Sequence, residues 1–352
     1  MNKRPPKSGE RIKIKHTLLV DGNALFKFGF FGAKGEFNHR GEHIGGVYQF
    51  LTILRKLLTE DLYHRVYVFW DGKLSGQLRY NIYANYKGDR NKDFINGTHP
   101  VDESEMKQKK MIWNYLEELC IRQLQDDVVE SDDYIAYYTN NKDVNEKITI
   151  CTTDRDMSQL LVNDNVRIYF CDLRAYVDNT NYLSYFCHHH ENACLLKTIT
   201  GDNSDCIKGV KGVKEPTLLS FFPELKERKV TLDEIIKRAA ELQDDRLTTK
   251  KPRLKSLDNI INGVTDGIQG DKLYEINNKL VNLSQPMMTP KSIENLEFIM
   301  EGEFNPDERG VKNVYVKMKV DGIDRTIGSN RYPDYLVPFK QLMERELKQN
   351  TL

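Results

Sequence analysis

Carboxylate side chains follow three apolar, β-branched segments of the sequence, at the point where each segment ends. The segments are LLVD, VYVFWD and KITICTTDRD, and their carboxylates are Asp21, Asp71, Asp154 and Asp156. Two like charges about 4 Å apart repel by roughly 1 kcal/mol in water and about 4 kcal/mol near a protein surface. A single Asp of this kind is therefore most simply a turn or helix-cap residue. The same feature at three strand ends indicates one shared site rather than three separate turns, because active sites of open α/β sheets form at the carboxyl ends of the strands.

Two further acidic groups add to this set. Glu130, Asp132 and Asp133 open an expected helix in VVESDDYIAYY, and Asp202 and Asp205 follow in TGDNSDC. In each group, two carboxylates are three residues apart, which places them on one face of a helix. Nine carboxylates at one sheet edge need a counter-charge, and hard divalent cations with oxygen ligands supply it. The pattern predicts a site for two Mg²⁺ ions, for which Mn²⁺ can substitute, of the kind that hydrolyses phosphodiesters. On this interpretation metal ions, rather than a turn, hold Asp154 and Asp156 together.

The elements that must position these acids alternate along the first two hundred residues. Short strands and amphipathic helices in this order predict an α/β domain with a mostly parallel central sheet. Strands are expected at 16–21, 65–72, 147–154 and 166–172, and helices at 45–61, 111–124 and 131–140. Helices joined by Gly-containing turns follow from about 195 to 300. In the tail, KNVYVKMKV alternates apolar and polar residues before Asp-Gly, which predicts a β-hairpin, and 333–349 is expected to be a closing helix.

Composition sets limits on the class of protein. Of the 352 residues, 52 are Lys or Arg and 52 are Asp or Glu, so the net charge is zero. The charges are nevertheless segregated, with basic segments at 1–15 and 246–255, and such a protein can still bind nucleic acid. No signal peptide or membrane-spanning run is present, and six cysteines without a C-x-x-C pair fit a reducing cytoplasm. The segment CHHHENAC (187–194) lacks a usual zinc-ligand spacing and is expected to be a loop before a helix.

The order of the motifs VDGN, FWDG, ESDD, TTDRD and GDNSD resembles the 5′-nuclease (flap endonuclease) family, especially the short bacteriophage members called ribonuclease H. The resemblance covers roughly residues 16–285. It implies a PIN-like α/β domain with a helical arch, followed by a helix–hairpin–helix region. It also implies two groups of metal ligands. Those of the first metal match Asp21, Asp71, Glu130, Asp132, Asp133 and Asp154, and those of the second match Asp156, Asp202 and Asp205.

A basic and aromatic segment, LRYNIYANYKGDRNK, lies between the second and third acidic motifs. Tyr83, Lys87 and Arg90 are spaced to line one face of a helix, and Arg79 starts the same stripe. Beside an acidic metal site, such a stripe is typical of a phosphate clamp with a base-stacking platform. YKGDR resembles the family's arch motif. The resemblance implies that Lys87 and Arg90 contact the scissile phosphate with Arg79 in support, and that Tyr83 or Tyr86 stacks on a base.

GVKGVKEPT (209–217) occupies the place of the family's glycine-rich hairpin, which holds the duplex backbone and often a K⁺ ion. Gly209 and Gly212 are present, but Lys214 and Pro216 replace the usual glycine and lysine. The sequence therefore does not establish a K⁺ site. Duplex binding is expected from the 246–255 segment and from Lys208, Lys211 and Lys214, because such contacts hold phosphates without reading sequence.

These features predict a structure-specific, metal-dependent 5′→3′ nuclease with exonuclease, flap endonuclease and ribonuclease H activity. It would remove RNA primers and 5′ flaps during DNA replication, acting on flaps, nicks, gaps and RNA–DNA hybrids and leaving 5′-phosphates. The attacking water would be held on the side of Asp132, Asp133 and Asp154. The resemblance implies a sliding clamp and a single-strand-binding protein as partners. We expect a monomer in the cytoplasm, which is the host cytoplasm if a phage encodes it.

Four segments are expected: a disordered basic arm (1–15), the PIN-like domain (16–205) with its arch (73–110), the helix–hairpin–helix region (206–300) and an extension (301–352), through which a clamp could bind. Two other functions stay open, a non-catalytic binder of replication intermediates and a PIN-type ribonuclease that acts on RNA alone. A haloacid-dehalogenase-like phosphatase is disfavoured, because Asn23 stands where that chemistry needs a second Asp.

Overall fold

The structure is a computed structural model that describes residues 15–88, 103–266, 270–302, 310–324 and 332–349. Its centre is a six-stranded sheet in the order β3-β2-β1-β4-β5-β6. The strands are β1 (His16–Asp21), β2 (Arg65–Asp71), β3 (Arg122–Asp126), β4 (Lys147–Thr152), β5 (Val166–Phe170) and β6 (Ala175–Val177). All neighbours pair in parallel except β5 and β6. The expected mixed α/β, PIN-like class with a mostly parallel sheet is confirmed.

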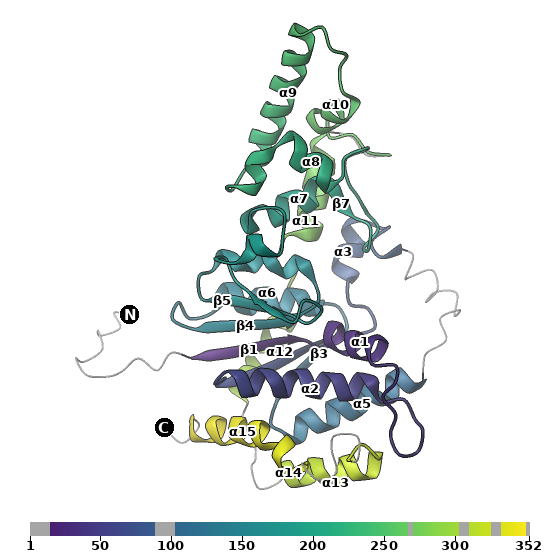
Figure 1. Ribbon diagram of the computed structural model, residues 1–352, viewed down its shortest axis with the longest axis vertical. Helices are drawn as coiled ribbons and strands as arrows, with labels where there is room; N and C mark the ends of the chain where they lie inside the picture. The colour runs from purple at the N-terminus through teal and green to yellow at the C-terminus, as the bar shows by residue number, and fades with distance from the viewer. Residues whose placement is uncertain (1–14, 89–102, 267–269, 303–309, 325–331, 350–352) are drawn as a thin grey trace, which may run out of the picture.

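Helices cover both faces of this sheet (Figure 1). One face packs against α1 (Gly22–Gly32), α2 (Gly45–Glu60) and α5 (Glu103–Glu118), and the other against α6 (Ser131–Asn141), the 3₁₀ segment η1 (Arg155–Val162) and α12 (Pro290–Glu301). Alternation along β1 explains the two layers, since Leu18 and Val20 enter the first core and Leu19 the second. Burial on both faces explains why the strand sequences are almost continuously apolar.

A second group of helices extends away from the sheet and fills the upper part of Figure 1. It comprises α7 (Ala193–Thr200), the short pair β7 (Gly201–Asp202) and β8 (Ile207–Lys208), α8 (Glu215–Phe221), α9 (Leu232–Thr248), α10 (Lys255–Ile261) and α11 (Asp271–Val281). These helices enclose a core of their own. A small cluster joins them to the rest, in which Tyr86 packs with Ile207 and Leu280.

Two expectations about secondary structure are wrong. The helix expected at 111–124 ends at Glu118, and residues 122–126 form the edge strand β3. The tail segment expected to be a hairpin is the helix α13 (Val311–Asp321). Val314 and Met318, four residues apart, are buried on one side of α13, whereas Val316 and Val320 are exposed. The Asp-Gly pair ends the helix, with Gly322 in the left-handed conformation (φ 74°).

The C-terminal extension is part of the main core. A closing helix is confirmed as α14 (Tyr332–Tyr335) and α15 (Val337–Gln349). Phe339 and Leu342 of α15 join the same buried cluster as α2 and α5. On the edge strand, the buried Arg122 guanidinium forms an ion pair with the buried Glu346 carboxylate. None of the described helices is both long enough and apolar enough to span a membrane.

Candidate active site

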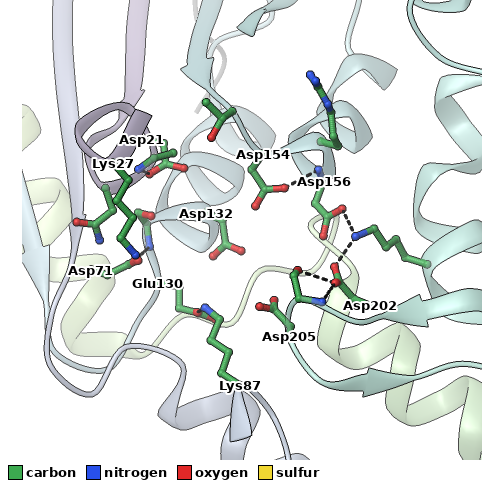
Figure 2. Close-up of a pocket in the computed structure, with 17 residues that line it drawn as sticks. Asp21, Lys27, Asp71, Lys87, Glu130, Asp132, Asp154, Asp156, Asp202 and Asp205 are labelled. Carbon is green, nitrogen blue, oxygen red and sulfur yellow. Dashed lines mark hydrogen bonds and ion pairs between the residues drawn. The ribbon is translucent and has the colours of Figure 1, made fainter. Parts of the chain in front are cut away.

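Eight carboxylates converge on one cleft of about 430 Å³ at the carboxyl ends of the parallel strands (Figure 2). This acid cleft is lined by Asp21, Asp71, Glu130, Asp132, Asp154, Asp156, Asp202 and Asp205. The in-register pairing of β1 with β2 and β4 brings the first acids together, because it aligns the ends of these three strands. Of the nine acids expected from the sequence, the structure places Asp133 outside this lining.

Local hydrogen bonds hold the strand-end acids of β1 and β2. Asp21 caps α1, with one carboxylate oxygen accepting from the Ala24 backbone N–H (3.0 Å) and the other from the Thr152 hydroxyl (3.1 Å). Asp71 accepts from the Ser131 N–H (2.8 Å) at the start of α6. Glycine follows Asp21 because a Cβ at Gly22 would lie 2.6 Å from the Trp70 ring. The sequence VDGN therefore encodes a capped and closely packed turn that fixes the first carboxylate.

Asp154 and Asp156 have different partners. Asp154 caps η1, because one of its oxygens accepts from the Asp156 backbone N–H (2.9 Å). The Asp156 carboxylate lies 3.0 Å from the Lys197 ammonium. A turn therefore contributes to holding Asp154, whereas the part that metal ions play in holding the pair stays a prediction. Both carboxylates nevertheless line the cleft.

A buried arginine organises the acids of α6. Arg79 of α3 (Gln77–Ile82) is 4% exposed and forms ion pairs with Glu130 and Asp133, the latter at 2.5 Å. Its Nε donates to the Leu280 carbonyl (2.8 Å) of α11. Asp133 also accepts a hydrogen bond from the Met287 N–H (2.9 Å). Asp132 is more exposed than these acids and lies in the cleft.

Lys87 approaches the cleft from the segment after α3. Its ammonium forms an ion pair with Glu130, and its backbone N–H donates to the Asp205 carbonyl (2.9 Å). The Tyr86 hydroxyl donates to Glu130 (3.0 Å) and to the Asp205 carboxylate (3.3 Å). These contacts to α6 and to the β7–β8 turn bring Lys87 into the left-handed region (φ 49°). Because of these contacts, the chain from Tyr83 to Lys87 does not continue helix α3.

The cleft is strongly electronegative. Burial, reinforced by Asp71 and Asp154, raises the pKa of Asp21 to about 7. Burial and Asp154 raise the pKa of Asp156 to about 7, against the opposing effect of Lys197. Burial alone would raise the pKa of Glu130, but Arg79 and Lys87 outweigh it and bring that pKa below its usual value. Eight carboxylates face four cations, Lys27, Lys87, Arg155 and Lys197, so the lining has a formal excess of four negative charges. This donor set fits divalent cations with oxygen ligands.

Comparison with known proteins identifies the domain that carries six of the eight acids of the cleft. Residues 16–186 match the family model described as the 5′–3′ exonuclease N-terminal, resolvase-like domain. These residues belong to that exonuclease family. The chain is 30% identical over 250 residues to the thermostable DNA polymerase I of Thermus caldophilus. It is 28% identical over 251 residues to the DNA polymerase I of Bacillus subtilis. The matches cover 68% and 67% of this chain but 29% and 27% of the polymerases, so the chain spans less than a third of these relatives.

Solved structures share the fold. The zinc-bound 5′-exonuclease of bacteriophage T5 has a TM-score of 0.59 at 18% identity, covering 88% of this chain and 99% of its own. A complex of the bacteriophage T5 flap endonuclease with DNA and metal ions has a TM-score of 0.55 at 18% identity, covering 94% and 100%. The similarity extends beyond the exonuclease domain into the helical region.

Within the exonuclease domain, the expected helical stripe of Arg79, Tyr83 and Lys87 is not formed. α3 ends at Ile82, and Tyr83 is extended. Tyr86 is only 3% exposed, so it offers no face to a base in this structure, whereas Tyr83 is half-buried. Arg90 lies outside the described residues.

Two lysines of the cleft were missed by sequence reasoning. Lys27 lies on α1, six residues after Asp21, and Lys197 lies on α7, five residues before Asp202. Neither spacing is a recognised signal, because each lysine reaches the acids only through the fold.

The lysines expected to bind duplex DNA lie outside the cleft lining. Lys208 is exposed on β8, Lys214 precedes α8, and Lys211 pairs with Asp266 (2.6 Å). Lys208 belongs to the β7–β8 pair and the other two lysines follow it. Strand β7 ends at Asp202, and Asp205 lies in the turn between the two strands. The helical region therefore contributes both acids to the cleft and basic side chains beside it.

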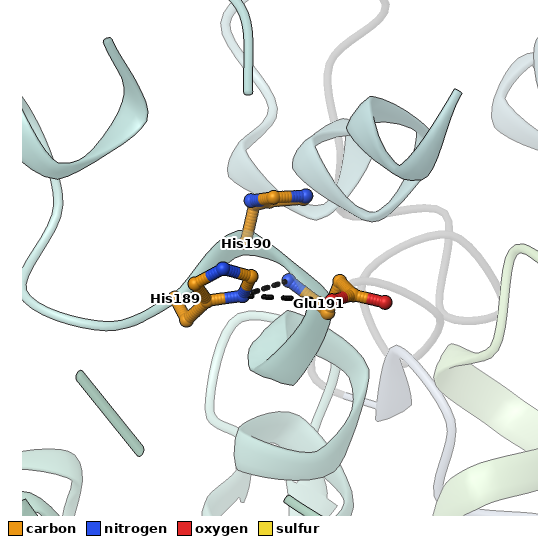
Figure 3. A group of neighbouring side chains, drawn as sticks. All are labelled: His189, His190 and Glu191. Atoms are coloured by element: carbon orange, nitrogen blue, oxygen red, sulfur yellow. Dashed lines mark hydrogen bonds and ion pairs between the residues drawn. The ribbon is translucent and has the colours of Figure 1, made fainter. Parts of the chain in front are cut away.

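A separate histidine group lies just before α7 (Figure 3). Donor atoms of His189, His190 and Glu191 lie within 4.8 Å of one another. His189 caps the 3₁₀ turn η3 (His190–Asn192) by accepting from the Glu191 N–H, and the Glu191 carboxylate pairs with Lys229 (3.2 Å). As expected for CHHHENAC, a loop leads into a helix here. These contacts indicate that His189 and Glu191 stabilise the local turn.

Proposed function

We propose that this chain is a divalent-metal-dependent 5′→3′ nuclease acting on DNA with 5′ flaps, nicks or gaps and on RNA primers paired to DNA, as an exonuclease, flap endonuclease and ribonuclease H. The observation that carries the proposal is the electronegative acid cleft at the sheet edge of a 5′–3′ exonuclease domain. The cleft lining has a formal excess of four negative charges, which bound divalent cations would offset.

Two ions would be held at the two ends of the cleft. Asp21, Asp71, Glu130, Asp132 and Asp154 would hold one, and Asp156, Asp202 and Asp205 the other. Mg²⁺ suits this all-oxygen donor set, and Mn²⁺ can replace it. Such ions, when bound, make water a better nucleophile and stabilise negative charge on phosphoryl oxygens, and the products would carry 5′-phosphates.

The remaining residues would bind and orient the substrate. Lys87, whose ammonium lies in the cleft, would neutralise charge on the scissile phosphate after leaving Glu130, and Arg90 is proposed for the same role. The burial of Arg79 and Asp133 supports a positioning role for both, since together they fix the start of α6. Tyr83 is the better candidate to stack on a base, because Tyr86 is buried.

Contacts outside the cleft would select substrates by shape. Lys208, Lys211 and Lys214 would hold duplex phosphates, which fixes position without reading sequence. We further propose that the protein is a cytoplasmic monomer whose partners are a sliding clamp and a single-strand-binding protein. Because α13 packs into the core, substitution of its exposed Val316 and Val320 tests clamp binding better than deletion of the extension.

The test is cleavage of a 5′-labelled flap duplex in Mg²⁺ and in EDTA. Asp154→Asn should reduce Mg²⁺-dependent cleavage by about 10³-fold or more, while the exposed Asp244→Asn on α9 serves as the matched control. An Asp154→Asn variant with the wild-type rate would refute the metal assignment. Tight binding without cleavage in Mg²⁺ and Mn²⁺ would favour a non-catalytic binder, and cleavage of RNA alone would favour a PIN-type ribonuclease.

A further inference from the structure

A lysine ammonium occupies the second acidic end of the cleft. Lys197 lies between two carboxylates, 3.0 Å from an oxygen of Asp156 and in an ion pair with Asp202. The dashed lines that join Asp156 and Asp202 to one nitrogen in Figure 2 mark these contacts. Asp202 is 8% exposed, so the ammonium is held by at least one carboxylate that is almost out of water.

We propose that Lys197 is a built-in counter-ion of this end of the cleft, and that a second divalent cation binds only when its ammonium withdraws from Asp156 and Asp202. This inference rests on the proposed function, since it concerns the same acids. It adds that the two cation sites differ in affinity because of a residue of the protein itself.

The hydrogen bonds of Asp202 support this competition. One of its oxygens already accepts the N–H (2.8 Å) and the hydroxyl (2.6 Å) of Ser204, and the other is paired with Lys197. A divalent cation that binds Asp202 therefore competes with the ammonium for the same oxygen. An ammonium and a metal ion that share the same oxygens also repel each other strongly in a partly buried site.

The other end of the cleft is arranged differently. The oxygens of Asp21 are bonded by the Ala24 N–H and the Thr152 hydroxyl, and Asp154 by the Asp156 N–H. These donors are neutral, and the lysine that pairs at this end, Lys87, holds Glu130 rather than Asp21 or Asp154. A first cation should therefore prefer the Asp21–Asp154 end, and the second should bind more weakly.

Mn²⁺ binding, measured by titration with detection of free Mn²⁺ by electron paramagnetic resonance, tests the proposal without an activity assay. Wild type should show a tight and a weak class of site. Lys197→Met should tighten the weak class at least tenfold and leave the tight class unchanged. Lys226→Met, at an exposed position outside the cleft, should match wild type, and Lys197→Arg should keep the weak class weak.

A second measurement uses the wild-type protein and does not depend on a variant that folds. Reductive methylation followed by mass spectrometry should label Lys197 at least threefold faster at Mg²⁺ concentrations that fill the weak class. Unchanged weak-class affinity in Lys197→Met, or unchanged labelling, would overturn this inference while leaving the nuclease proposal intact. Absence of any Mn²⁺ binding to wild type would overturn both.

Discussion

Removing the buried Arg79 guanidinium should destabilise the protein by about 3–5 kcal/mol, the usual result of removing one partner of a buried ion pair. Arg79 is 4% exposed, and its nitrogens contact Glu130, Asp133 and the Leu280 carbonyl. In Arg79→Met, Glu130 keeps Lys87 and the Tyr86 hydroxyl. Asp133, 1% exposed, would lose the cation that balances its charge.

Urea unfolding in EDTA at pH 7, followed by the fluorescence of Trp70 and Trp113, measures this loss. Taking a slope of about 3 kcal/mol per M urea, a loss of about 4 kcal/mol lowers the midpoint by about 1.3 M. Arg79→Lys should be intermediate, because a single ammonium cannot reproduce the forked contacts of a guanidinium.

The double variant Arg79→Met/Asp133→Leu isolates the pair. Removing the carboxylate together with the guanidinium should recover at least about 1 kcal/mol relative to Arg79→Met, since no uncompensated charge remains at position 133. A midpoint for Arg79→Met within about 0.3 M of wild type would refute the reasoning. So would a double variant whose losses simply add.

Three further predictions concern activity, pH and the extension. Lys87→Ala should lower the cleavage rate by about 10²–10³-fold. Its affinity for duplex DNA, measured by fluorescence anisotropy, should fall by less than about tenfold. Equal losses of rate and affinity would contradict the role of Lys87 at the phosphate. Burial, despite the nearby Asp61, lowers the pKa of His16 to about 4. Between pH 6.5 and 4 the imidazole therefore binds a proton in the unfolded state but not in the folded state. The free energy of unfolding should fall by about 2 kcal/mol as pH drops from about 6.5 to 4. His16→Gln should lose that part of the pH dependence, and an unchanged profile would be contrary evidence. Deleting residues 302–352 removes six or more buried apolar side chains, and each contributes about 1.5–3 kcal/mol to the stability of the fold. The truncated protein should therefore show no cooperative thermal unfolding by circular dichroism. Cooperative unfolding near the temperature of the full chain would show that the extension is dispensable.

The strand-end acids could be predicted from the sequence because their signal is local. Asp21 and Asp71 each end an apolar run. Parallel pairing of the two strands places both residues at the same edge of the sheet, independently of the conformation of the loops. The sequence could not show that Asp133 turns away from the cleft. That depends on Arg79, which is 54 residues distant and reaches it from α3.

The errors arise where a local pattern fits two structures. Val314 and Met318 are two positions of a period-two strand and also an i,i+4 pair of a helix. Contacts with α5 favour the helical conformation of α13. Lys317 pairs with Glu118 (2.8 Å), and the Tyr115 hydroxyl donates to Asp321 (2.5 Å). Those partners are about two hundred residues away, so no window of the sequence contains them. The same holds for Lys87, whose backbone bond to Asp205 replaces the expected helix.

The carboxylates of the acid cleft come from residues between 21 and 205, a separation of 184 residues. On a ribosome that adds roughly 5–20 residues per second, about 10–40 s separate the synthesis of the first and last of these acids. Throughout that interval the nascent chain holds only part of its acid set. A nascent chain therefore lacks the complete cleft until the helical region has emerged, and no early folding intermediate should be competent to cut nucleic acid.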